Sequence, residues 1–210
     1  MHTHFIGIGG IGMSALARHL YACGNTISGT DRENSELITS LTAEGIDVMC
    51  GAHKKSHLPK SAERVIFTAA INENNPERKE ATRRGIPCLS YAEAIGSLTR
   101  QYKTITISGS HGKSTTTALL ALALIEGYAN PTVIVGTTLT EFSGLNYRRG
   151  TSPYLVLEAD EWNKSFLNYS PHIAIITTVD AEHLDTYGNV KEVERTFREY
   201  CKKVPSDGAI

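Results

Sequence analysis

The stretch HFIGIGGIG at residues 4–12 sets the expected fold of this 210-residue chain. An apolar run leads into Gly7, Gly9 and Gly12, which have the spacing GxGxxG and stand at the start of a helical pattern. Glycine permits the tight turn that such a loop needs, and the unpaired N–H groups of a helix N-terminus can bind a phosphate. The stretch therefore predicts a Rossmann-like strand, loop and helix that bind a diphosphate.

Asp31 extends this reading, because it ends the second predicted strand and lies 19 residues beyond Gly12. An acidic residue at that place can accept a hydrogen bond from a ribose hydroxyl. Taken alone, the two features predict a dinucleotide-binding dehydrogenase. A UDP-sugar also carries a diphosphate, so the identity of the nucleotide stays open.

A second glycine-rich loop, GSHGKST at residues 109–115, stands between a β-branched strand pattern and a helix pattern. It matches the core of a Walker-type phosphate loop, although its first glycine is Gly109 instead of residue 107, so the loop is a shortened variant. We predict that Lys113 reaches the β- and γ-phosphates and that the Ser114 hydroxyl binds Mg²⁺. His111 could contact the ligand or be an exposed loop histidine. The expected ATP-binding residues are Gly109, Ser110, His111, Gly112, Lys113, Ser114 and Thr115.

Acidic residues and a histidine follow two further predicted strands. The sequence EADE at residues 158–161 follows the strand at 154–157, and His183 follows the strand at 173–178. Ligands of open α/β sheets lie at the carboxyl ends of the strands, where carboxylates opposite a phosphate loop suit Mg²⁺. The alternatives are a solvated acidic loop and a structural histidine; convergence of three strand ends on one crevice favours function.

Short apolar runs alternate with longer helical patterns along the whole chain, which indicates an α/β protein with mainly parallel sheets. A polar, basic stretch at 99–103 interrupts the pattern, so we expect a Rossmann-like domain at 1–100 and a P-loop ATPase-like domain at 101–210. A strand begins at 205–210 with nothing after it, so the second domain is expected to be truncated. The expected strands are 4–8, 26–29, 65–69, 104–108, 132–135, 154–157 and 173–178, and the expected helices are 11–23, 35–44, 76–84, 91–98, 113–126 and 190–203.

The charge composition of the chain limits the kinds of partner that it is expected to bind. The formal net charge of −1 gives no electrostatic footprint for nucleic acid or for an anionic membrane, and neither is expected as a partner. No signal peptide opens the chain, and its four scattered cysteines indicate reduced thiols and no zinc site. We expect a cytoplasmic protein; its oligomeric state is not indicated by the sequence.

Eight segments, in order along essentially the whole chain, resemble the Mur ligase family. They are HFIGIGGIGMSA at 4–15, GTD at 29–31, TAAINENNPE at 68–77, RGIP at 84–87, GSHGKSTTT at 109–117, EADE at 158–161, SFL at 165–167 and DAEHLDTYG at 180–188. The resemblance implies a UDP-sugar on the first domain, ATP and Mg²⁺ on the second, and a third, amino-acid-binding domain that this chain lacks. It implies ADP-forming ligation of L-alanine to UDP-N-acetylmuramate through an acyl phosphate, in peptidoglycan precursor synthesis.

Matched position by position, the resemblance also implies roles. Lys113, Glu158 and His183 would be catalytic, and Ser114, Glu158 and His183 would hold the metal, with serine where the family usually has threonine. The UDP-sugar would be bound by Gly9, Gly10, Ile11, Gly12, Asp31, Ala69, Ala70 and Asn72.

Departures from the family pattern leave alternatives open. Trp162 after EADE leans toward the ligase that attaches a recycled murein tripeptide to the same sugar, whereas HLDTYG leans toward L-alanine. A non-catalytic nucleotide-binding module and an NAD-dependent oxidoreductase are the alternatives from other classes. We further expect the 210-residue chain alone to be inactive as a ligase.

Overall fold

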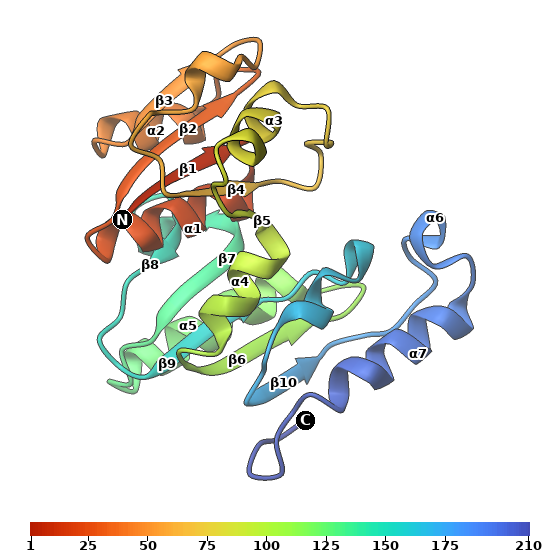
Figure 1. Cartoon of the computed structure of the whole chain (residues 1–210). Helices are drawn as coiled ribbons and strands as arrows, with labels where there is room; N and C mark the ends of the chain where they lie inside the picture. The colour runs from red at the N-terminus through yellow and green to blue at the C-terminus, as the bar shows by residue number, and fades with distance from the viewer. The chain divides into compact units, whose positions relative to one another are not determined.

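The computed structural model describes residues 1–210, without the side chains of Leu184 and Asp185. Its contacts divide the chain into two compact units, Met1–Ala94 and Ile95–Ile210. Each unit contains its own five-stranded sheet with helices packed against it (Figure 1). The expected α/β class, with mainly parallel sheets, is confirmed.

The first unit has a fully parallel sheet in the order β3-β2-β1-β4-β5. This is the Rossmann order, in which the switch point lies beside the central strand β1. The strands are β1 His2–Ile6, β2 Thr26–Asp31, β3 Asp47–Cys50, β4 Arg64–Phe67 and β5 Cys88–Ser90. The helical elements are α1 Ile11–Ala22, α2 Glu36–Ala43, the 3₁₀ turn η1 Lys55–His57, α3 Pro76–Arg83 and α4 Tyr91–Thr99, the last of which crosses the division between the units.

Local sequence explains where these helices begin. Ser35 caps α2 by accepting a hydrogen bond from the N–H of Ile38, and Asn75 caps α3 through the N–H groups of Glu77 and Arg78. Pro76 occupies the first turn of α3, where its missing N–H costs nothing.

The second unit has a mixed sheet in the order β10-β6-β9-β7-β8. Only the edge pair β7–β8 is antiparallel. The strands are β6 Lys103–Ser108, β7 Thr132–Leu139, β8 Leu145–Arg148, β9 Tyr154–Glu158 and β10 Ile173–Ile176. The helical elements are α5 Lys113–Glu126, η2 Thr140–Phe142, η3 Trp162–Asn168, α6 Leu184–Tyr187 and α7 Val190–Cys201.

The core of the second unit forms where α5 covers the sheet. Ile107, Ala121, Val133 and Val156 come from α5 and the three central strands and pack together. A separate aromatic cluster fixes α7: the Phe166 ring stacks on Tyr200 at a centroid distance of 4.4 Å and meets Phe197 edge-on at 5.1 Å. Helix α7 confirms the helix expected at 190–203, and one of its faces is buried.

Several element boundaries differ from those expected. The first strand is His2–Ile6 instead of 4–8, because Gly7 already turns the chain with φ of 81°. The strand expected at 65–69 ends at Phe67, since Thr68 accepts a turn hydrogen bond from Ile71. Strands β3, β5 and β8 were not expected; they have three or four residues each, which is too short for a clear period-two pattern.

The strand expected at 205–210 is reduced to one parallel bridge between Ala209 and Ile173.

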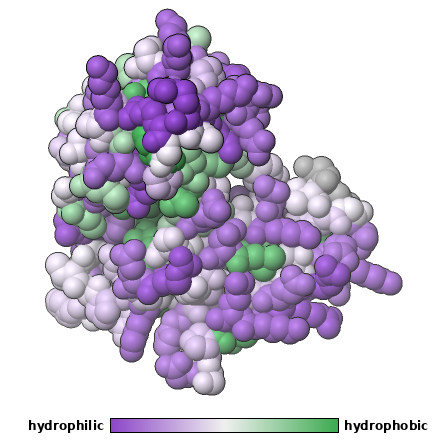
Figure 2. All heavy atoms as spheres, in the orientation of Figure 1, coloured by the Kyte–Doolittle hydropathy of each residue, from purple (hydrophilic) through white to green (hydrophobic). Residues whose placement is uncertain are grey.

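Among the described residues, no helix combines the length and apolar character needed to cross a membrane. Figure 2 shows a mostly hydrophilic face on which apolar residues form small, separate areas.

Candidate functional site

Three parallel strands of the second unit bring their carboxyl ends together. Strand β6 lies between β10 and β9 in the sheet, so the segments that follow Ser108, Glu158 and Ile176 meet at one edge. This is the edge at which open α/β sheets bind ligands. The convergence of these three strand ends, expected from the sequence, is confirmed.

The glycine-rich loop at 109–112 is fixed to the segment after β10. The Ser110 N–H donates to the Thr178 carbonyl at 2.9 Å, and the His111 N–H donates to Thr178 Oγ1 at 3.0 Å. The Asp180 N–H donates to Ser110 Oγ at 2.8 Å. Gly109 has φ of 131°, and a Cβ there would lie 2.3 Å from Thr177 Oγ1, so the tight approach requires glycine.

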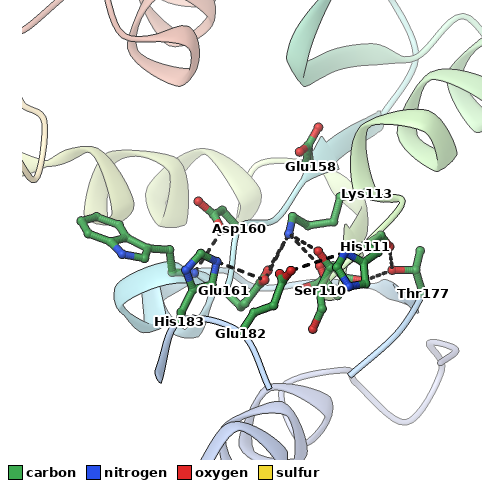
Figure 3. A network of polar contacts seen from close by, with 12 residues as sticks. Ser110, His111, Lys113, Glu158, Asp160, Glu161, Thr177, Glu182 and His183 are labelled. Carbon is green, nitrogen blue, oxygen red and sulfur yellow. Dashed lines mark hydrogen bonds and ion pairs between the residues drawn. The ribbon is translucent and has the colours of Figure 1, made fainter. Parts of the chain in front are cut away.

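Lys113 is the first residue of α5, and its side chain folds back over this loop. Its Nζ donates to the Gly109 carbonyl at 2.7 Å and to Glu161 Oε1 at 3.1 Å (Figure 3). Glu161 is 2% exposed, so this ion pair is largely removed from water. The ammonium therefore lies where a phosphate group on the loop would meet it.

Ser114, the next residue, faces a different carboxylate. Its Oγ donates to Glu158 Oε1 at 3.0 Å, while the Gly136 N–H donates to Glu158 Oε2 at 2.7 Å. A Cβ on Gly136 would lie 2.6 Å from Glu158 Oε1. Gly136, inside β7, thus fixes the carboxylate at the end of β9 from a distance that only glycine allows.

His183 joins a second acidic group. Ligand atoms of Asp160, Glu161 and His183 lie within 4.8 Å of one another, with Glu161 Oε1 3.7 Å from His183 Nε2. The Tyr187 hydroxyl donates a short hydrogen bond to the Glu161 carbonyl. Burial, with the charges of Glu161 and Asp160 nearby, raises the pKa of Tyr187 to about 12.

The structure thus divides the predicted metal ligands between two places. Ser114 lies against Glu158, whereas His183 lies against Glu161 and Asp160, and Figure 3 shows Glu158 apart from that group. Of the other predicted loop residues, His111 is exposed and lies 3.4 Å from Glu182, and Thr115 is exposed on the first turn of α5.

The sequence interpretation missed several contributors to this site. Glu161 and Tyr187 belonged to the EADE and DAEHLDTYG segments, and Thr178 ended a predicted strand, but none of the three received a role. Gly136 was not considered. Gly136 carries one usable signal, because a glycine inside a β-branched strand often marks a close backbone approach. Thr178 and Tyr187 carry none, since only the fold brings them to the loop.

In the first glycine-rich loop, backbone N–H groups donate within the protein, whereas the sequence predicted that N–H groups here bind a diphosphate. The Gly7 and Ile8 N–H groups donate to the Thr30 carbonyl, and the Gly9 N–H donates to Asp31 Oδ2 at 2.8 Å. The other oxygen of Asp31 accepts from the Arg32 N–H at 2.7 Å. Both oxygens of Asp31 therefore already hold the loop, although each retains a lone pair for a ribose hydroxyl.

A cavity of about 530 Å³ opens in the first unit between the segments after β3 and β4. Its lining includes Arg32, His53 and the predicted residues Ala70 and Asn72. Ala69, also predicted, is exposed but is not one of the lining residues. The remaining predicted residues of the glycine loop, Gly10, Ile11 and Gly12, are not part of this lining either.

A buried carboxylate supports one wall of that cavity. Glu77, in α3, accepts hydrogen bonds from His4 Nε2 at 2.8 Å, His53 Nδ1 at 2.7 Å and Thr30 Oγ1 at 2.9 Å. Its side chain has 0% exposure, and burial alone would raise its pKa. The hydrogen bonds from the two histidines and Thr30 outweigh burial and lower the pKa of Glu77 below its usual value.

Comparison with known proteins defines the class to which this fold and site belong. Residues 2–103 match the model described as "Mur ligase family, catalytic domain", and residues 107–210 match "Mur ligase middle domain". The chain belongs to the Mur ligase family, as its motifs indicated.

Two of the similar proteins are UDP-N-acetylmuramate–L-alanine ligases. The chain is 41% identical over 210 residues to the UDP-N-acetylmuramate–L-alanine ligase of Agathobacter rectalis and 42% identical over 208 residues to that of Caldanaerobacter subterraneus subsp. tengcongensis. The two matches include 100% and 99% of this chain but 45% of each relative. The chain therefore spans about half the length of these relatives.

Solved structures agree with this assignment. The UDP-N-acetylmuramate-alanine ligase of Thermotoga maritima superposes with a TM-score of 0.89 at 32% identity, over 100% of this chain and 48% of that one. The UDP-N-acetylmuramate:L-alanyl-gamma-D-glutamyl-meso-diaminopimelate ligase of Neisseria meningitides gives 0.90 at 26% identity, over 99% and 69%.

Proposed function

We propose that this chain is the nucleotide-binding part of an ATP-dependent ligase that joins L-alanine to UDP-N-acetylmuramate. Residues 1–100 would bind the UDP-sugar and residues 101–210 would bind ATP. The names and identities of the relatives support the activity. The observation that carries the ATP site is the adjacent pair Lys113 and Ser114, which face the carboxylates of Glu161 and Glu158 at the carboxyl edge of a parallel sheet.

The proposed reaction is a phosphoryl transfer followed by an acyl transfer. A carboxylate oxygen of the sugar attacks the γ-phosphorus of ATP, the bond to the bridging oxygen breaks, and ADP leaves with an acyl phosphate formed. The amino group of L-alanine then attacks the acyl carbon, and phosphate leaves as the amide forms. In this chain, Lys113 and the N-terminus of α5 would offset the charge on the transferring group.

The residues present fit a magnesium ion. Ser114 Oγ and the Glu158 carboxylate are hard oxygen donors beside the loop, and one buried oxygen of Glu161 has no hydrogen-bond donor among the described residues. Ser114 and Glu158, which lie together, would hold the ion, whereas His183 lies with Glu161 and Asp160 at the second place. When bound, Mg²⁺ supplies positive charge that offsets the charge of the phosphates.

The recycled-tripeptide ligase remains the second candidate. Trp162 follows the EADE segment, and a tripeptide ligase is one of the structures that superpose well. The full-length enzyme distinguishes the two candidates: we expect ADP release to depend on L-alanine, and dependence on the tripeptide instead would favour the second.

Substitution of Lys113 by alanine tests the ATP site directly. We expect Lys113→Ala to weaken ATP binding about tenfold or more, because a charge-assisted contact to phosphate is lost. Calorimetric titration with ATP, and separately with UDP-N-acetylmuramate, measures this in the 210-residue chain. The affinity for the UDP-sugar should stay unchanged.

Two results would contradict the proposal. Equal ATP affinity in the folded Lys113→Ala variant would favour a non-catalytic module over the ligase. Binding of NADH in preference to UDP-N-acetylmuramate would favour the oxidoreductase that the first glycine loop alone suggests.

A further inference from the structure

Glu161 enters the function proposed above only as a neighbour of Lys113 and of the magnesium site, yet it is the most enclosed acidic group of the site. It is 2% exposed, whereas Asp160 is exposed and Glu158 is only partly buried. A carboxylate removed from water needs compensating positive charge or hydrogen bonds. The groups that contact Glu161 therefore indicate which interaction its buried negative charge serves.

The main compensating group is the ammonium of Lys113. Nζ lies 3.1 Å from each carboxylate oxygen, with hydrogen-bond geometry only toward Oε1. Within the part of the chain that the structure describes, Oε2 receives no hydrogen bond. The carboxylate is thus stabilised mostly by one cation, and it is this cation that phosphate would also use.

Glu161 itself is held in place from two sides. The Tyr187 hydroxyl donates to its carbonyl, and His183 Nε2 lies 3.7 Å from Oε1. Lys113, by contrast, reaches Glu161 through a long side chain with several rotatable bonds. When a phosphate competes for the ammonium, the lysine side chain can move and the carboxylate stays.

We propose that Glu161 is a positioning residue that acts through Lys113. In the nucleotide-free chain, the Glu161 carboxylate holds the Lys113 ammonium against the loop. When ATP binds, a phosphate replaces this carboxylate as the ion-pair partner of the ammonium. Glu161 therefore opposes nucleotide binding while it keeps Lys113 ready for the phosphates. This inference rests on the ATP site proposed above.

Calorimetric titration of the 210-residue chain with ATP in magnesium-containing buffer tests this exchange. We expect Glu161→Gln, which keeps the size of the side chain but removes its charge, to bind ATP about fivefold more tightly or better, because a competing negative charge is gone. The affinity for UDP-N-acetylmuramate should not change.

Glu182→Gln is the matched control. Glu182 also lies beside the loop, 3.4 Å from His111, but among the described residues the carboxylate that pairs with Lys113 is that of Glu161. We expect its ATP affinity to stay within about twofold of that of the unsubstituted chain. An equal gain in both variants would overturn the exchange, because the effect would then be general charge repulsion.

The results of the ATP titrations distinguish a failure of the proposed role of Glu161 from a failure of the proposed ATP-binding function. No ATP binding by the unsubstituted chain would contradict the proposed function. ATP binding by that chain, with equal or weaker binding by folded Glu161→Gln, would overturn the role of Glu161 alone.

A second measurement does not depend on that variant folding. Without nucleotide, Lys113→Ala leaves Glu161 buried without its cation, so we expect its Tm to fall by several degrees. Lys191→Ala, an exposed position at the start of α7, controls for loss of a lysine. An unchanged Tm for Lys113→Ala would show that the ammonium is not held by Glu161.

Discussion

At the scale of single residues, the site depends on side chains and glycines whose partners are distant in sequence. The sequence predicted Lys113, Ser114 and Glu158 from the strand ends that carry them, and the structure places all three at one edge. It could not predict that Glu158 meets Ser114 while His183 meets Glu161, because strand order does not determine which carboxylate turns toward which loop.

Gly136 gives the prediction that belongs to this scale. Gly136→Ala adds a Cβ where the Glu158 oxygens stand at 2.6 and 2.8 Å, so the carboxylate must move. We expect weaker ATP binding in magnesium-containing buffer, by about tenfold, because displacing a ligand by an ångström disturbs the site it shares with Ser114.

Gly127→Ala is the control for this substitution. Gly127 follows α5 with φ of −77°, which alanine also adopts, and a Cβ there would lie 3.3 Å from the Ala123 carbonyl oxygen, a milder contact than at Gly136. Titration of both variants with ATP measures the effect. If Gly136→Ala binds ATP as tightly as Gly127→Ala, Glu158 does not act on the nucleotide.

At the scale of elements, the long periodic segments were predicted well and the short ones were not. Helix α5 was expected at 113–126 and lies there, since its glycine loop fixes its start and Gly127 its end. Strands β3, β5 and β8 have too few residues to show a period, and their neighbours in the sheet determine them. Tertiary pairing, and not local preference, creates these edge strands.

Glu77 ties three elements together, because it joins α3 to β1 through His4 and to β2 through Thr30. We expect Glu77→Gln to lower the free energy of unfolding by about 1–3 kcal/mol, since buried donors lose a charged acceptor. Chemical unfolding at pH 7 measures this change.

The pH dependence of stability follows from the lowered pKa of Glu77. Because its pKa is lower in the folded than in the unfolded chain, its contribution is complete above about pH 4.5 and is lost as the pH falls through the folded-state pKa. We expect Glu77→Gln to lose less stability than the unsubstituted chain over that acid range. Parallel loss in both chains would contradict the assignment.

At the scale of the whole molecule, the chain contains two glycine-rich loops on two separate sheets and spans about half the length of its relatives. The proposed reaction also needs a site for the amino acid, which the resemblance places on a third domain. We therefore expect the 210-residue chain to show no L-alanine-dependent formation of ADP. A coupled ADP assay with UDP-N-acetylmuramate, ATP and L-alanine checks this, and turnover above background would contradict it.

The glycine-rich loop at 109–112 is held in shape by residues outside it. Ser110 and His111 are hydrogen-bonded to Thr178 and Asp180, which lie far along the chain in the segment that follows the neighbouring strand β10. A compound wedged beside the end of β10 would deform the loop without entering the place of the triphosphate. Because the deformed loop could not accept ATP, the compound and ATP would weaken each other's binding, and raising the concentration of ATP would relieve the inhibition although the two bind at different places.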